Sequence, residues 1–216
     1  MELYKIDVEI PLNHIHLNGI LQIPKNPTGI VLFVHGSGSS RFSQRNQHVA
    51  SILNQSNIAT LLFDLLTPDE EEVDEFTREH RFNIELLASR LVIVTDWISQ
   101  QPKTHHLAIG YFGASTGAGA ALQAAAKRQD MVKAIVSRGG RPDLAGEDLS
   151  HIKAPTLLIV GGHDEPVIEM NRQAMEEMHC TNKLEIIPGA THLFEESGAL
   201  DEVARLAKDW FKQYLS

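Results

Sequence analysis

The sequence predicts an α/β fold in which a mostly parallel central sheet is covered by helices on both faces. Short apolar runs alternate with longer amphipathic runs from residue 30 onward, and this alternation is typical of βαβ units. The apolar runs have the length of strands and the composition of strands buried on both faces. A length of 216 residues is ordinary for one α/β domain, and no domain boundary is evident, so we expect a single domain over residues 1–216.

The first 28 residues predict a different element. The runs "YKIDVEIPL" and "NHIHLNGILQIP" indicate two strands that meet around Pro11-Leu12-Asn13. Two strands joined by such a short turn form an antiparallel hairpin. We therefore expect a hairpin at one edge of the sheet.

The remaining elements follow from residue 29 onward. Apolar runs predict six more strands, at 29–36, 58–65, 106–112, 132–138, 154–162 and 183–189. Helical spacing of apolar residues predicts five helices, at 45–57, 81–101, 117–128, 167–178 and 197–215. Residues 139–152 are rich in glycine and turn formers, so we expect a long loop or one short helix there. The acidic run 69–75 predicts a solvated loop or a helix start.

Composition argues against several classes of function. The formal net charge is −9, whereas nucleic-acid-binding proteins usually carry a basic patch. No apolar run approaches the roughly 20 residues of a membrane helix, and the first residues do not have the pattern of a signal peptide. The single cysteine, Cys180, can form no internal disulfide. We expect a cytoplasmic protein that binds neither nucleic acid nor membrane, and its oligomeric state stays open.

The stretch "GASTG", residues 113–117, lies between a predicted strand and a predicted helix. It matches G-x-S-x-G, the turn that exposes a nucleophilic serine at the edge of an α/β sheet. Large side chains at Gly113 and Gly117 would collide with neighbouring backbone in so tight a turn. The alternative is that Ser115 only caps the following helix, with glycines for close packing.

A serine nucleophile needs a base and an acid that orients the base. Asp164 follows the predicted strand 154–162, and His192 follows the strand 183–189. The order Ser, Asp, His fits this architecture, and all three residues leave the same edge of the sheet. His192 would take the proton of Ser115, and Asp164 would fix the tautomer of the imidazole.

Other residues compete for these roles. Asp143 follows the preceding strand and is the second choice for the acid, while Glu165 lies one residue further from its strand than Asp164. His163 is interpreted as a surface loop residue. No histidine shows the spacing of a metal site, so we expect no metal. Hydrolysis through a serine, a histidine and an aspartate implies no organic cofactor either.

The loop "HGSGSS", residues 35–40, follows the first parallel strand. Its small residues would let backbone N–H groups approach a substrate carbonyl, so we expect an oxyanion hole formed by the amides of Ser37 and Thr116. The alternatives are a flexible turn or a phosphate loop. The loop lacks the Gly-Lys-Ser/Thr ending of a P-loop.

Arg138 ends the apolar run 132–137 at the same edge of the sheet. A guanidinium there could bind a carboxylate or phosphate of the substrate. It could equally pair with Asp143 or Asp164 and hold the loop, and both readings stay open.

The histidine-glycine loop, the serine elbow, the late aspartate and the late histidine together resemble the α/β-hydrolase superfamily over essentially the whole chain. The similarity is greatest to the dienelactone hydrolase branch, whose members are small and lack a large cap domain. Residues 35–50 and 137–146 resemble a bacterial subgroup that is sometimes fused to phosphoribosyltransferase-like domains. The namesake enzymes use a cysteine nucleophile where this chain has Ser115.

The resemblance implies an α/β-hydrolase fold without a large cap. It also implies a serine hydrolase that cleaves a small carboxylic ester, thioester or lactone through an acyl-enzyme on Ser115. The rival hypothesis is a noncatalytic scaffold of the same fold that binds a small molecule or a partner protein.

Overall fold

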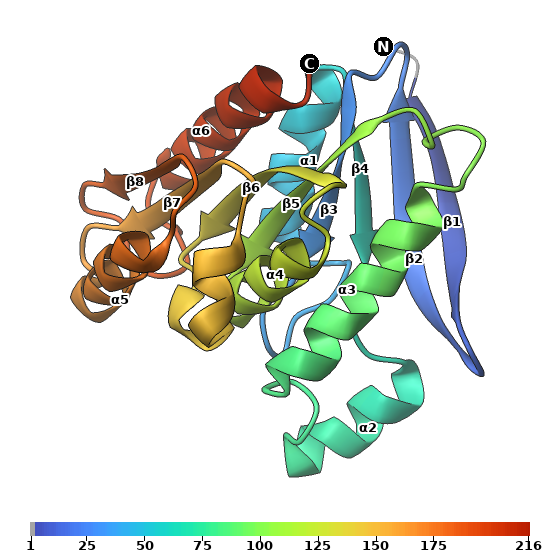
Figure 1. Cartoon of the computed structure of the whole chain (residues 1–216), viewed down its shortest axis with the longest axis horizontal. Coiled ribbons are helices and arrows are strands. Elements are labelled where there is room, and N and C mark those ends of the chain that lie inside the picture. The colour runs from blue at the N-terminus through green and yellow to red at the C-terminus, as the bar shows by residue number, and fades with distance from the viewer. Residues whose placement is uncertain (1–2) are drawn as a thin grey trace.

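Eight strands form one sheet in the computed structural model, which describes residues 3–216 (Figure 1). The order across the sheet is β1-β2-β4-β3-β5-β6-β7-β8, and the strands from β3 to β8 run parallel. The strands are β1 Leu3–Leu12, β2 Ile15–Pro24, β3 Gly29–Val34, β4 Ile58–Phe63, β5 Ala108–Ala114, β6 Val132–Arg138, β7 Thr156–Gly161 and β8 Asn182–Ile187.

The expected hairpin is confirmed: β1 pairs with β2 antiparallel, and β2 in turn pairs antiparallel with β4. Every residue of β3, β4 and β7 is buried, as parallel strands covered on both faces require. The hairpin strand β1 lies at the edge and is mostly exposed along its first half. The sheet is therefore parallel at its centre, where the candidate residues lie, and antiparallel at one edge.

Helices cover both faces of the sheet. They are α1 Gln44–Gln55, α2 Pro68–Thr77, α3 Ile84–Ile98, α4 Thr116–Lys127, α5 Glu165–Glu177 and α6 Ala199–Tyr214, with a 3₁₀ segment at Pro142–His151. In Figure 1, α3, α4 and α5 lie in front of the sheet and α1 lies behind it. Side chains of α1 and α6 share one buried apolar cluster, and those of α3 and α4 share another. No helix within residues 3–216 is long and apolar enough to cross a membrane.

Two segments that the sequence left open have defined structures. Residues 142–151 form two short 3₁₀ turns that meet at Gly146, whose φ of 54° breaks the helix. The acidic run begins a helix, α2, whose amino end is fixed by a capping box between Thr67 and Glu70. Acidic side chains in its first turn also interact favourably with the helix dipole.

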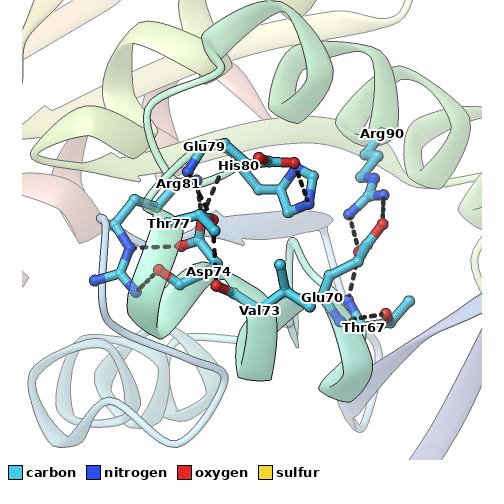
Figure 2. A network of polar contacts seen from close by, with 9 residues as sticks. All are labelled: Thr67, Glu70, Val73, Asp74, Thr77, Glu79, His80, Arg81 and Arg90. Carbon is cyan, nitrogen blue, oxygen red and sulfur yellow. Dashed lines mark hydrogen bonds and ion pairs between the residues drawn. The ribbon is translucent and has the colours of Figure 1, made fainter.

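Helix α2 is fastened to α3 by an ion pair (Figure 2). Both terminal nitrogens of Arg90 donate to the carboxylate of Glu70, at 2.5 and 2.7 Å. One of these nitrogens also donates to the carbonyl of Leu65 at 2.6 Å. Arg90 is only 5 % exposed, so these bonds satisfy a charge that would otherwise be costly to bury.

The carboxyl end of α2 is held by a second ion pair. The buried carboxylate of Asp74 accepts from the backbone N–H of His80, from that of Arg81 and from Arg81 Nε (Figure 2). Burial by itself would raise the pKa of Asp74, but the bonds from Arg81 and His80 outweigh it and lower the pKa. The carboxylate therefore stays ionised and closes the turn between α2 and α3.

Removing the Arg90 side chain should show how much this fastening contributes. Arg90→Met leaves the Glu70 carboxylate without its cation and the Leu65 carbonyl without a donor, so we expect the free energy of unfolding to fall by about 2 kcal/mol. Chemical denaturation measures this loss. The control is Arg205→Met, which removes an equally bidentate pair with Glu202 on the exposed face of α6. An equal loss in both variants would show that the buried pair on α2 stabilises the protein no more than the exposed pair on α6.

Candidate active site

Ser115 lies in the tight turn between β5 and α4, with φ 52° and ψ −122°. A positive φ is rare for a residue with a side chain, and it costs on the order of 1–3 kcal/mol. Two backbone hydrogen bonds with the end of β6 and the segment after it hold this conformation. The N–H of Ser115 donates to the carbonyl of Arg138, and the N–H of Arg141 donates to the carbonyl of Ser115, both at 3.1 Å.

The two glycines of the turn are required by close approach of backbone. A Cβ at Gly117 would collide with the carbonyl oxygens of Val34 and His35, and one at Gly113 would lie 2.5 Å from Cα of Ala118. Because these neighbours are backbone atoms, they cannot rotate away. The glycines thus bring the start of α4 directly against the end of β3.

The structure brings together Ser115, His192 and Asp164. His192 Nε2 lies 3.3 Å from Ser115 Oγ, and His192 Nδ1 lies 2.6 Å from Asp164 Oδ2. The carboxylate can hold only the tautomer with a proton on Nδ1, which leaves Nε2 free to accept the serine proton. The Asp164 side chain is 16 % exposed and that of His192 is 38 % exposed, so substrate can reach the imidazole.

The competing residues lie elsewhere. Asp143 forms a bidentate ion pair with Arg141, at 2.7 and 2.8 Å. His163 and Glu165, on either side of Asp164, are exposed. None of the three is hydrogen-bonded to His192 within residues 3–216, and the carboxylate that contacts its Nδ1 is that of Asp164.

Ser37 and Thr116, the expected oxyanion donors, are in contact with each other. The backbone N–H of Ser37 donates to the Thr116 hydroxyl at 2.9 Å. A Cβ at Gly36 would lie 3.2 Å from Cβ of Ser115, so the loop after β3 borders the nucleophile closely. The hydroxyl of Thr116 therefore ties this loop to the start of α4 at the place where a substrate carbonyl would enter.

His35 has a structural role that sequence reasoning missed. Its ring is buried, Nδ1 donates to the carbonyl of Gly36 at 2.9 Å, and Nε2 accepts from the N–H of Leu65 at 3.1 Å. Burial lowers the pKa of His35, and this outweighs the raising effects of Gly36 and Asp64. The neutral imidazole thus joins the loop after β3 to the loop after β4. The position of His35 directly after a buried strand is the signal that could have revealed it.

A cavity of about 410 Å³ lies beside the loop that follows β3. Apolar side chains of Phe42, Leu65, Leu66 and Leu87 line it together with carboxylates of α2. Burial, with help from the nearby charge of Asp64, raises the pKa of Glu71 among these carboxylates. Ser37, one of the expected oxyanion donors, also lines the cavity, whereas Ser115 and His192 are not among its lining residues.

Arg138 is buried at the carboxyl end of β6, 7 % exposed. Neither acid that the sequence offered as its partner is available, because Asp143 pairs with Arg141 and Asp164 with His192. The structural pairing expected as one alternative is therefore wrong. The other alternative, contact with a substrate anion, stays a hypothesis.

Within residues 3–216, no group of three or more His, Cys, Asp or Glu side chains is arranged to hold a metal ion. Cys180 lies near Thr156, at the amino end of β7 and thus at the opposite edge of the sheet from Ser115. Cys180 is therefore not part of the turn that carries Ser115.

The buried His35 predicts a pH dependence of stability. Because the pKa in the folded state is below the ordinary value of about 6.5, the unfolded chain binds the extra proton first. The contribution of His35 is then complete above pH 6.5 and is lost as the pH falls below it, by up to about 1.4 kcal/mol per pH unit. Urea unfolding from pH 5 to pH 8 measures this slope.

The matched variant is His35→Gln, which can still accept from Leu65 but does not titrate. The wild type should lose stability relative to this variant as the pH falls from 7 to 5. A constant difference between the two proteins over that range would show that His35 does not titrate on unfolding.

Comparison with known proteins agrees with this fold. The model of the Dienelactone hydrolase family matches residues 17–216. A crystal structure of a dienelactone hydrolase from Anabaena variabilis is 58 % identical, with each chain covered completely and a TM-score of 0.98. Est1E from Butyrivibrio proteoclasticus has the same fold, with a TM-score of 0.80 at 19 % identity, over 96 % of this chain and 98 % of its own.

Two curated relatives come from strains of Mycobacterium tuberculosis and carry the name "Putative phosphoribosyl transferase". Each is 55 % identical over 209 residues, which is 97 % of this chain. The chain spans 46 % of their length. The family match, the structural match and the α/β-hydrolase architecture agree, and the chain belongs to the dienelactone hydrolase family.

Proposed function

We propose that this hydrolase is a serine esterase that cleaves small carboxylic esters, thioesters or lactones. The observation that carries the proposal is the continuous chain from Ser115 Oγ through His192 to Asp164, with distances of 3.3 and 2.6 Å. The serine of this hydrogen-bonded series lies in a strained turn at the amino end of a helix. Such an arrangement is suited to nucleophilic attack on an acyl carbon.

In the proposed first half-reaction, His192 Nε2 takes the proton of the Ser115 hydroxyl as its oxygen attacks the substrate carbonyl. Asp164 stabilises the imidazolium that forms. The amide of Thr116, at the first residue of α4, and that of Ser37 donate to the developing oxyanion. The Ser37 amide would exchange its bond with the Thr116 hydroxyl for one with the substrate, or share it. The imidazolium then protonates the leaving alcohol or thiol.

In the proposed second half-reaction, His192 takes a proton from water, which attacks the acyl-enzyme. The tetrahedral intermediate collapses, the Ser115 oxygen recovers its proton from the imidazolium, and the carboxylic acid leaves. Neither half-reaction as proposed requires a metal or an organic cofactor. The described chain carries no large cap over this edge, and this supports small substrates rather than long acyl chains.

The relatives named as phosphoribosyl transferases do not change this proposal. The name belongs to proteins of which this chain spans less than half, and the family model that matches residues 17–216 is a hydrolase family. The second candidate is a noncatalytic scaffold of the same fold, which would keep the site geometry without turnover.

Active-site labelling separates an enzyme from a scaffold. A fluorophosphonate should modify Ser115, with the adduct located by mass spectrometry, and Ser115→Ala should lower turnover of a short-chain nitrophenyl ester by about 10³-fold or more. Circular dichroism should show that the variant is folded. A folded wild type that takes no adduct and turns over no ester would be the scaffold.

A matched pair of variants tests the orienting acid. Asp164→Asn removes the charge that holds the imidazole tautomer and should cut kcat by up to about 10⁴-fold. Asp143→Asn makes the same chemical change in the exposed pair with Arg141 and should cost little. Steady-state kinetics on one ester gives both values. A larger effect at Asp143 would assign the acid to the segment after β6.

A further inference from the structure

Arg138 carries a buried charge that has no hydrogen-bond or ion-pair partner among residues 3–216. Its Nε is fully buried, and no atom of the described residues is hydrogen-bonded to it. The two terminal nitrogens also have no hydrogen-bond partner within residues 3–216, but they are not fully buried, so the small exposed part of this side chain includes them. An unpaired guanidinium is costly to bury, and a fold does not hold one without compensation.

The charged neighbour of Arg138 is a second cation, Arg45, at the start of α1. Burial, and then the positive charge of Arg45, lower the pKa of Arg138 to about 10, so Arg138 is still charged at neutral pH. Arg45 Nε is also buried, and no described residue is hydrogen-bonded to it. The nearest carboxylate oxygen to Arg45 belongs to the exposed Glu195, at 3.7 Å. This place between α1 and β6 therefore has an excess of positive charge.

The backbone of Arg138 lies between the nucleophile and the base. Its carbonyl accepts from the N–H of Ser115 at 3.1 Å. The next residue, Gly139, is so close to the imidazole that a Cβ there would lie 3.4 Å from His192 Cε1. The guanidinium lies 6.0 Å from the ring centroid of Phe194, two residues after His192. The unpaired charge is thus built into the same edge of the sheet as the proposed reacting groups.

We propose that Arg138, with support from Arg45, binds an anionic group of the substrate, a carboxylate or a phosphate, next to the ester that Ser115 attacks. The inference rests on the proposed esterase function and narrows its substrates to anionic esters. The planar guanidinium can donate two parallel hydrogen bonds to such a group. The bound anion would supply the counter-charge that the protein itself does not provide.

Kinetics with matched esters tests the preference. In the first pair of nitrophenyl esters, the acyl chain of one ester ends in a carboxylate and that of the other ends in the corresponding neutral methyl ester. In the second pair, one acyl chain ends in a phosphonate and the other ends in the corresponding neutral phosphonate diester. The wild type should favour one anionic ester over its neutral partner in kcat/KM on the order of ten- to a hundredfold. The favoured pair identifies the anion as a carboxylate or a phosphate.

In Arg138→Met the ratio of kcat/KM within the favoured pair should fall to about one. Arg141→Met also removes an arginine, but one that pairs with Asp143, and should keep the wild-type ratio. If Arg138→Met does not fold, Arg138→Lys keeps the charge but loses the fork, and its ratio should fall several-fold. An unchanged ratio in the folded variant would overturn the inference.

Thermal unfolding gives a readout that does not need turnover. Inorganic phosphate or propionate should raise the Tm of the wild type above that in sodium chloride of equal ionic strength. Without the anion, Arg138→Met should melt at the same or a higher temperature, because an unpaired buried charge is removed, and the anion should no longer stabilise it. A lower Tm for Arg138→Met than for the wild type, with no stabilisation of either protein by the anion, would show that Arg138 is a structural residue.

The two proposals fail in different ways. Turnover of neutral esters without preference for an anionic one would leave the esterase proposal intact and contradict the role of Arg138. Absence of all turnover would contradict the esterase proposal, and the thermal measurement would then decide whether Arg138 binds an anion.

Discussion

The contact between the start of α4 and the end of β3 is the constraint on which the candidate site depends. Gly117 lies against the carbonyl oxygens of Val34 and His35, where no side chain fits. This contact fixes the distance between the serine turn and the loop after β3. The bond from the Ser37 amide to the Thr116 hydroxyl follows from it. The positive φ of Ser115 is then maintained from the other side by β6 and its loop.

Much of the fold and part of the site could be predicted from the sequence. Continuous apolar strands, the early hairpin and the order of Ser115, Asp164 and His192 are local signals, because strand ends and short loops determine which edge each residue leaves. The lack of an ion-pair partner for Arg138 among the described residues could not be predicted, since the pairing of Asp143 with Arg141 rather than with Arg138 depends on side-chain directions in three dimensions. Helix α2 was missed as a complete helix because its polar sequence is stabilised by distant arginines rather than by an apolar face.

The charges around the site differ on its two sides. Carboxylates of α2 border the cavity beside the loop after β3, whereas Arg138 and Arg45 lie toward α1 under the loop that carries His192. The chain has a net charge of −9, yet among the described residues only the exposed Glu195, 3.7 Å from Arg45, brings a carboxylate to this pair of arginines. A substrate held between these two sides would be oriented by its own charge distribution as well as by its shape.

The manner in which α2 is attached has a consequence for how such a protein can diverge. The helix is joined to α3 and to its own flanking turns by ion pairs, and it forms no part of the two apolar clusters that cover the sheet. Residues 68–83 can therefore be exchanged or lengthened during evolution with little effect on the nucleophile turn, whereas Leu65, which donates to His35, belongs to the contact between the loops after β3 and β4. Because α2 also lines the cavity, this one connection can alter what is accommodated beside an unchanged reaction centre.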